Sequence, residues 1–204
     1  MGKREGFFMP RTKRAVVDGG VYHILNRGHN KDKIFCRADD FIRFKEIING
    51  YKEKYDYEIY HYCIMPNHFH LLMKIGKADE LSPLMKGICQ SYANYYRNAY
   101  EHVGYLFQNR YKSIFIEDDS YLLECARYIE RNPVRANLTD NVSGYPWSSY
   151  NHYTGGRRDD FITMNPLFET LAGNEEGRKD VYMEYMSKSR PYEYIVDEKI
   201  RSFK

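Results

Sequence analysis

The chain has 204 residues, which is enough for one domain with an extension or for two small domains, and we expect the former. Its composition, 43% apolar and 29% charged residues with 21 tyrosines, is typical of a globular protein. It has no run of the ~18 apolar residues needed to span a bilayer, and no signal-peptide core follows its basic start. We therefore expect a cytoplasmic protein without a membrane partner.

The positive charge is concentrated in an N-terminal arm, residues 1–14. The net charge of the whole chain is +3, but five cations stand against Glu5 in this arm, a local +4, so the other 190 residues sum to −1. The cations are Lys3, Arg4, Arg11, Lys13 and Arg14. Such an arm is expected to contact phosphates, and a solvated leader is the alternative that charge alone leaves open.

The four cysteines exclude two classes of small scaffold. They stand at positions 36, 63, 89 and 125, separated by 27, 26 and 36 residues, and none forms a C-x-x-C motif. This spacing fits neither a zinc knuckle nor a disulfide framework. We expect buried thiols.

The first half of the chain predicts three strands and one helix. Alternating side chains over 20–27 indicate a strand, and apolar residues at three- and four-residue spacing over 38–55 indicate a helix with acidic residues at its start. Two runs rich in strand-forming residues follow, 57–65 and 68–75. Only Pro66 and Asn67 separate them, which predicts a tight hairpin.

The second half predicts a long helix over 81–100 and a fourth strand over 111–117. A third helix starts at 118 with Asp and Ser cap candidates. We expect it to end near Asn132, because the residue before Pro133 is disfavoured in helical geometry. A further helical pattern lies in the extension, at 177–188.

The order of these elements indicates an α+β fold. A β-α-β-β-α-β arrangement followed by a helix predicts a ferredoxin-like, RRM-like antiparallel sheet, with two helices packed on one face and the other face left available. Residues 154–204 would be a C-terminal extension of unknown role.

One motif in this pattern can carry chemistry. "MPNHFHLL", residues 65–72, places His68 and His70 two apart on a predicted strand, so both imidazoles lie on one face. Such a pair can bind a metal ion or be purely structural, and the motif alone leaves both interpretations open. His23 and His61 lie on other predicted strands and could orient such ligands, or be ordinary core or surface histidines.

A second candidate pair lies on the last helix of the fold. Tyr128 and Asn132 are four residues apart and therefore share a helix face. A helical tyrosine more often packs than reacts, so this spacing does not decide between packing and catalysis.

Cationic and aromatic residues are candidates for nucleic-acid contacts. Arg110 and Lys112 in "NRYKS" join Arg11, Lys13 and Arg14 as candidate phosphate contacts. Tyrosines nearby can stack on unpaired bases. The candidates on the second helix are Tyr95, Tyr96, Arg97 and Tyr100, although core packing is the favoured interpretation for Tyr92 and Tyr95.

Four stretches of the sequence resemble a known family. They are "YHILNRG", "YCIMPNHFHLLM", "NRYKSIFIEDDSYLLECARYIERNPVRANL" and "YPWSSY". Together, and in this order, they resemble the REP-associated tyrosine transposases within the wider single-tyrosine HUH transposase family. The resemblance covers residues 15–153 and does not extend to the tail.

The resemblance implies a reaction and a role for each motif. Related enzymes cleave and rejoin single-stranded, hairpin-associated DNA through a covalent 5′-phosphotyrosine intermediate. Tyr128 matches the nucleophile, and His68 and His70 match the two metal-binding histidines. Asn132 matches the position that completes the metal site, where relatives place Gln. The implied cofactor is a divalent cation, Mg²⁺ or Mn²⁺, and imidazole ligands suit Mn²⁺ or Zn²⁺ better than Mg²⁺.

Two other functions remain open from the residues. A catalytically inactive nucleic-acid-binding protein could use the same fold, although its third strand would usually carry a basic and aromatic pattern rather than histidines. A metal hydrolase without a covalent step would leave Tyr128 without a role. The sequence also leaves open whether the protein is a monomer or a homodimer.

Overall fold

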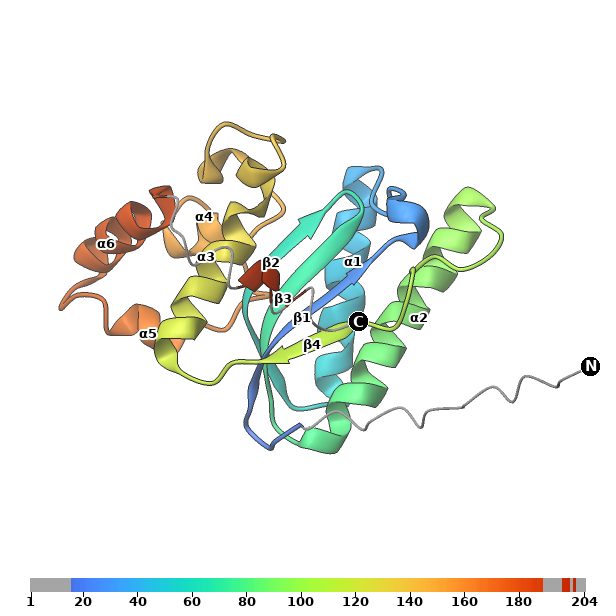
Figure 1. Cartoon of the computed structure of the whole chain (residues 1–204), viewed down its shortest axis with the longest axis horizontal. Coiled ribbons are helices and arrows are strands. Elements are labelled where there is room, and N and C mark those ends of the chain that lie inside the picture. The colour runs from blue at the N-terminus through green and yellow to red at the C-terminus, as the bar shows by residue number, and fades with distance from the viewer. Residues whose placement is uncertain (1–15, 189–195, 199, 201–204) are drawn as a thin grey trace, which may run out of the picture.

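The computed structural model of the protein describes residues 16–188, 196–198 and 200 (Figure 1). The basic arm, with Arg11, Lys13 and Arg14, lies outside the described residues. No helix of the described ranges combines the length and the apolar character needed to cross a membrane.

The described elements follow the predicted order. The strands are β1 Val21–Arg27, β2 Tyr57–Met65, β3 His68–Ile75 and β4 Lys112–Phe115. The helices are α1 Ala38–Gly50, α2 Leu81–Tyr100, α3 Asp119–Arg135, α4 Tyr150–Tyr153, α5 Pro166–Glu169 and α6 Glu175–Ser187. Short 3₁₀ turns lie at His29–Lys31, Tyr51–Glu53, Ala78–Glu80 and Val142–Gly144.

The four strands form one antiparallel sheet in the order β2-β3-β1-β4. This order places β1 and β3 at the centre and β2 and β4 at the edges. It is the order of the ferredoxin-like arrangement, so the predicted α+β fold is confirmed.

Helices α1 and α2 cover one face of the sheet with an apolar core. Phe44 of α1 is fully buried, and its ring contacts those of Phe35, Phe69 and Tyr92 at centroid distances of 4.8–5.2 Å. The single tryptophan, Trp147, stacks on Phe41 of α1 at the margin of this core. This face is therefore closed by interlocking aromatic rings.

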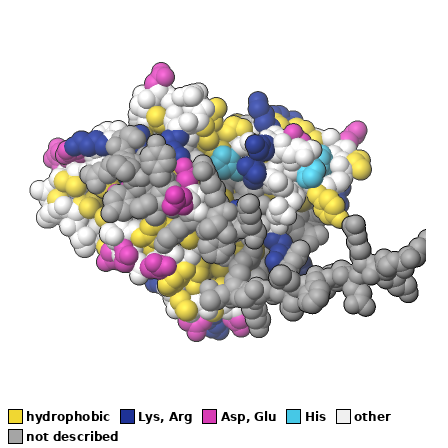
Figure 2. Space-filling view, viewed as in Figure 1, with side chains coloured by type: hydrophobic (Ala, Val, Ile, Leu, Met, Phe, Trp, Pro, Cys, Tyr) yellow, Lys and Arg dark blue, Asp and Glu magenta, His cyan; other side chains and the backbone are white. Residues whose placement is uncertain are grey.

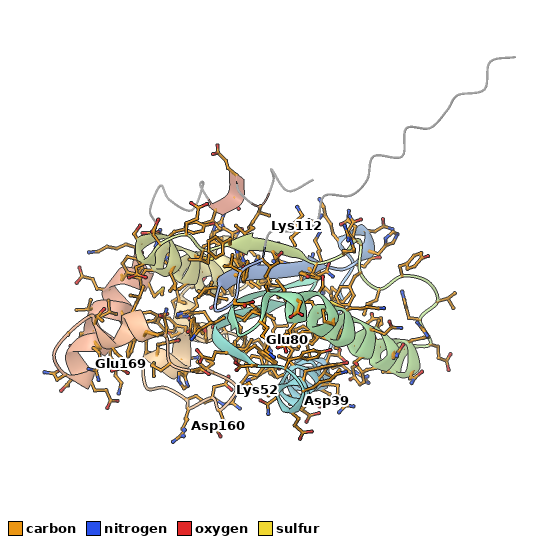
Figure 3. All side chains as sticks on the ribbon, turned by 90° about the horizontal axis from the view of Figure 1, so that it is seen from below. Asp39, Lys52, Glu80, Lys112, Asp160 and Glu169 are labelled. Atoms are coloured by element: carbon orange, nitrogen blue, oxygen red, sulfur yellow. The ribbon has the colours of Figure 1, made fainter. Side chains whose placement is uncertain are left out.

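The prediction that the other face of the sheet is left available is wrong. Helix α3 packs across it, over β2 and β3, so that the sheet lies between α3 on one side and α1 and α2 on the other (Figures 1 and 3). The apolar stripe Leu122, Ala126 and Ile129 requires this burial, and it packs with Cys63 and Leu72 of the sheet.

The expectation of buried thiols is met by two of the four cysteines. Cys63 and Cys125 are buried, but Cys36 is exposed and Cys89 is only partly buried.

The end of α3 also differs from the prediction. The helix does not stop at Asn132 but continues through Pro133 to Arg135. Pro133 lies near the end of the helix, so it removes only one backbone hydrogen bond. The backbone hydrogen bonds after it still form: the Ala136 amide donates to the Asn132 carbonyl, and the Leu138 amide donates to the Pro133 carbonyl. Asn137, with φ of 53°, then adopts the left-handed conformation that ends many helices.

The extension adds to the core on the α3 side. The helix expected at 177–188 is α6, and its Tyr182 and Met186 are fully buried with Tyr153 and Phe168. The extension thus shares one hydrophobic cluster with α3. The domain boundary at 153 stays a prediction.

Candidate active site

The histidine pair lies on the α3 face of the central strand β3. His70 is paired across the sheet with Leu25, and His68 with Arg27 at the end of the strand. The two imidazole rings stand nearly perpendicular with centroids 4.9 Å apart. The structure therefore places His68 and His70 side by side, away from the core formed by α1 and α2, as the strand alternation predicted.

A third histidine supports the pair from the neighbouring strand. His23 of β1 is fully buried, and its Nε2 lies 2.8 Å from Nδ1 of His70. This hydrogen bond leaves Nε2 of His70 as the ring nitrogen that can face a cation. Nδ1 of His23 is buried and has no hydrogen-bond partner among the described residues.

Asn67, in the hairpin turn, orients His68. Its Oδ1 lies 2.6 Å from Nδ1 of His68. An amide oxygen can only accept, so this Nδ1 carries the ring proton and the lone pair lies on Nε2. His68 is thereby held in the tautomer that a metal ligand at Nε2 requires.

Burial keeps the three imidazoles neutral. It lowers the pKa of His23 to about 3 and, together with the positive charge of Arg27, that of His68 to about 4. The pKa of His70 lies well below its usual value because of burial first and then His68, His23 and Arg135. Neutral imidazole is the form that a metal ligand requires, so both candidate ligands are in this form at neutral pH.

Tyr128 of α3 faces the histidines from across the site. Its ring centroid lies 5.8 Å from that of His70 and 6.0 Å from that of His23, so one chain supplies both halves of the site. Its hydroxyl donates to Oδ1 of Asp197 at 2.8 Å. Arg135 lies over the ring and forms an ion pair with Oδ2 of Asp197 at 2.6 Å. A carboxylate thus bridges the phenol and a guanidinium.

The resting phenol is protonated. Burial raises the pKa of Tyr128, and the hydrogen bond and negative charge of Asp197 raise it further, while Arg135 opposes the shift. A nucleophilic Tyr128 therefore needs a proton acceptor and nearby positive charge.

Asn132 lies one turn after Tyr128 and presents an oxygen. Its Nδ2 donates to the Tyr128 carbonyl at 2.9 Å, and its Oδ1 makes no hydrogen bond in the described part of the chain. No group of three or more His, Cys, Asp or Glu side chains that could hold a metal occurs among these residues. The candidate donor set is instead two imidazoles and one amide oxygen, which suits Mn²⁺ better than Mg²⁺.

The candidate DNA-contacting residues lie in different environments in the structure. Arg110 is exposed, whereas Lys112 lies on the same face of the sheet as α3 and donates to the Ile200 carbonyl at 2.8 Å (Figure 3). The hydroxyls of Tyr95 and Tyr100 donate to the buried carboxylate of Asp40, so their role is in packing α2 on α1. Figure 2 shows dark-blue side chains, the colour of Lys and Arg, beside a histidine on the face seen in that view.

A buried polar cluster fixes α3 against the sheet. Glu130 accepts hydrogen bonds from Ser149, from Tyr182 at 2.8 Å and from His61 Nδ1 at 2.9 Å. Nε2 of His61 meets the amide of Asn165 at 2.9 Å. All five side chains are at most 5% exposed. The cluster joins β2, α3 and α6, and His61 serves it rather than the histidine pair.

Sequence reasoning missed Asp197 and Arg135. Arg135 stood inside a stretch that resembled the transposases, but only the path of α3 beyond Pro133 brings it over Tyr128. Asp197 is 69 residues from Tyr128 in an extension that matched no motif. Spacing along the chain gave no signal for such a contact.

Comparisons with known proteins identify the family. The sequence profile described as "Transposase IS200 like" matches residues 16–132, more than half of the chain. A Haemophilus influenzae protein named as a candidate REP-associated tyrosine transposase is 27% identical over 154 residues, which cover 70% of this chain and 86% of that protein. The solved structure of a REP-associated tyrosine transposase bound to a REP hairpin is similar with a TM-score of 0.61 at 17% identity.

That alignment covers 78% of this chain and 93% of the solved one, and it shows a shared fold. The matched range 16–132 contains the whole sheet, the histidine pair, Tyr128 and Asn132. The chain therefore belongs to the IS200-like transposase family.

Proposed function

We propose that this transposase cleaves and rejoins single-stranded, hairpin-associated DNA, with Tyr128 as the nucleophile. The observation that carries the proposal is the placement of the Tyr128 ring 5.8 Å from that of His70. The Nδ1 atoms of both His68 and His70 are hydrogen-bonded, so Nε2 is the ring nitrogen of each that can bind a ligand. The hairpin is suggested by the similar solved structure, whose protein is bound to a REP hairpin.

The proposed step exchanges one phosphate ester for another. The Tyr128 oxygen attacks the scissile phosphorus, the bond from phosphorus to the 3′-oxygen breaks, and the 5′-phosphate becomes attached to the tyrosine. The departing 3′-oxygen takes a proton from water. Because the ester bond is retained on the tyrosine, a 3′-hydroxyl can later reverse the reaction and join strands without ATP.

Asp197 is placed to accept the proton that Tyr128 must lose. The hydroxyl already donates to its Oδ1, so the transfer needs no rearrangement of heavy atoms. Arg135 contacts the same carboxylate and the tyrosine ring, and its positive charge favours the phenolate.

We infer that His68, His70 and Asn132 would together hold a divalent cation, because two imidazoles and an amide oxygen are groups that bind such ions. Such a cation supplies Lewis-acid stabilisation of the charge that develops on the phosphate and the departing oxygen. The chain itself provides the orientation, through Asn67 for His68 and His23 for His70.

The test is capture of the covalent intermediate. Wild-type protein incubated with a labelled hairpin oligonucleotide in Mn²⁺ should form a protein–DNA adduct that survives boiling detergent. Tyr128→Phe removes one oxygen and should abolish the adduct while leaving folding and DNA binding intact. Tyr121→Phe, two turns earlier on α3, is the matched control and should form the adduct. Adduct on a peptide that lacks Tyr128 would refute the assignment.

Asp197→Asn tests the proton acceptor separately. Loss of a positioned base should slow adduct formation by about 10²-fold or more. A faster variant would contradict this role and show that the carboxylate competes with the DNA phosphate for Arg135.

A further inference from the structure

We propose that the backbone carbonyl of Lys31, acting through the side-chain amide of Asn67, determines which ring nitrogen of His68 carries the proton. The inference rests on the proposed function, because it concerns a candidate metal ligand of that site. It makes Asn67 and the turn around Lys31 positioning elements, which act on the cation only through His68.

The segment that follows β1 is folded over the turn between β2 and β3. The Gly28 amide donates to the Asn67 carbonyl at 2.9 Å. The Ile34 and Phe35 amides donate to the Pro66 carbonyl at 2.8 and 2.9 Å, and both of their side chains are buried in the aromatic core. Three backbone hydrogen bonds therefore fix the two residues of the hairpin turn against this segment.

The backbone of the segment is constrained where it makes these contacts. A Cβ on Gly28 would lie 2.4 Å from the Asp32 carbonyl oxygen, which is too close for any side chain, so only glycine fits there. Asn30 and Lys31 have φ of 50° and 65°, the left-handed region that asparagine tolerates and lysine rarely adopts. Both side chains are exposed. Such a conformation persists where the surrounding structure holds it, and here it presents the Lys31 carbonyl to the hairpin turn.

The Lys31 carbonyl orients the Asn67 amide. Nδ2 of Asn67 donates to this carbonyl oxygen at 3.0 Å, and a carbonyl oxygen can only accept. Oδ1 of Asn67 must then face His68, whose Nδ1 lies 2.6 Å away. An amide rotated by half a turn would bring two oxygens together at Lys31. It would also present an N–H group to His68, which favours the tautomer with the proton on Nε2.

This choice of tautomer matters for a metal ligand. A neutral histidine side chain in water favours the tautomer with the proton on Nε2, and that form has no lone pair there for a cation. His68 is thus held in the form that it would not favour alone. His70 receives its own orienting contact from His23, so the two candidate ligands are positioned independently.

The first experiment reads the tautomer of His68 in metal-free protein at pH 8, from the imidazole signals of ¹⁵N-labelled histidine. The wild type should carry the proton on Nδ1. Asn67→Leu, similar in size but without polar atoms, should move it to Nε2 and weaken Mn²⁺ binding by about 10- to 100-fold. Asn67→Asp presents only acceptors, so it should keep the proton on Nδ1 and recover the affinity. Unchanged His70 signals in both variants show that the sheet is intact.

The second experiment tests Lys31 through its backbone. Asn30→Val places a β-branched residue in the left-handed region, so it should displace the Lys31 carbonyl, move part of the His68 population to the Nε2 tautomer and weaken Mn²⁺ binding. Combined with Asn67→Asp, the same substitution should have no such effect, because a carboxylate needs no orientation. Lys33→Val, at an exposed residue outside the left-handed pair, is the matched control.

Two results would overturn the proposal. One is an Asn67→Leu variant with the wild-type tautomer and Mn²⁺ affinity. The other is an Asn30→Val variant in which the His68 signals stay as in the wild type. These readouts use metal-free protein and Mn²⁺ without DNA, so absence of the Tyr128 adduct would refute the proposed function and leave the tautomer result standing.

Discussion

The two faces of the sheet are filled by different kinds of residues. On the α1 and α2 side, aromatic rings such as Phe44 and Tyr92 interlock around the strands. On the α3 side, His23, His70 and Glu130 are buried among apolar residues at 2% exposure or less. Burying such polar groups costs free energy that apolar packing does not. The difference indicates that the first face mainly supplies stability, whereas the second holds the candidate active site.

The largest expected effect lies on the aromatic face. Phe44→Ala removes a fully buried ring that contacts three others and should lower the free energy of unfolding by about 3–5 kcal/mol. Urea unfolding measures this loss. Ile42→Ala, at a residue of α1 that is 47% exposed, is the control and should cost far less. Similar losses of unfolding free energy in both variants would contradict the conclusion that the buried aromatic rings supply the stability of this face.

Glu130→Gln probes the polar cluster on the other face. The carboxylate accepts hydrogen bonds from three groups, and the amide nitrogen of Gln would meet a donor instead. We expect a loss of about 1–3 kcal/mol in unfolding free energy. Glu46→Gln, which disrupts only an exposed ion pair with Arg43, is the control and should change stability by less than about 1 kcal/mol. An unchanged Glu130→Gln variant would mean that the cluster does not fix α3.

Substitutions of His23 test whether this residue supports metal binding or only fills space. His23→Leu removes the hydrogen bond to Nδ1 of His70 and should weaken Mn²⁺ binding by about 10- to 100-fold, measured by calorimetry without DNA. His23→Gln can place a polar atom near the former Nε2 and should recover part of the affinity. A leucine variant that binds Mn²⁺ like the wild type would show that His23 only fills space.

The smallest effect is a pH dependence of the metal-free protein. The pKa of His23 is about 3 in the fold and 6.5 when the chain is unfolded, so acid protonates the unfolded state first and stability falls as pH drops below 6.5. Between pH 8 and pH 6, His23 alone should remove ~0.8 kcal/mol. Urea unfolding at both pH values measures the fall. It should be shallower in His23→Leu, and an equal fall in both proteins would contradict the assignment.

Local pattern was sufficient for most of the fold. The hairpin strands 57–65 and 68–75 and the helix 81–100 were predicted at the boundaries the structure has, because a two-residue Pro-Asn turn and a long apolar periodicity leave little freedom. Strand alternation also put His68 and His70 on one face. Strand alternation could not predict which helix covers that face, because the position of α3 depends on the surface against which its apolar stripe packs.

The parts of the site that sequence missed depend on tertiary contacts. The prolongation of α3 past Pro133 depended on hydrogen bonds made after the proline, and it determines where Arg135 lies. Asp197 reaches Tyr128 from the extension, for which no pattern indicated a role. The roles of Tyr128, His68, His70 and Asn132 stay proposals, now with a geometry that can be tested.

The placement of the histidines on inner strands has a consequence for hydrogen exchange. His23 lies on β1 and His70 on β3, and each of these strands is hydrogen-bonded to a neighbour on both sides. Amides in such strands exchange with solvent mainly when the whole sheet opens, whereas edges and termini open locally. His70 and the histidine that orients it, His23, should therefore keep their spacing through local fluctuations of the molecule and lose it only on global unfolding.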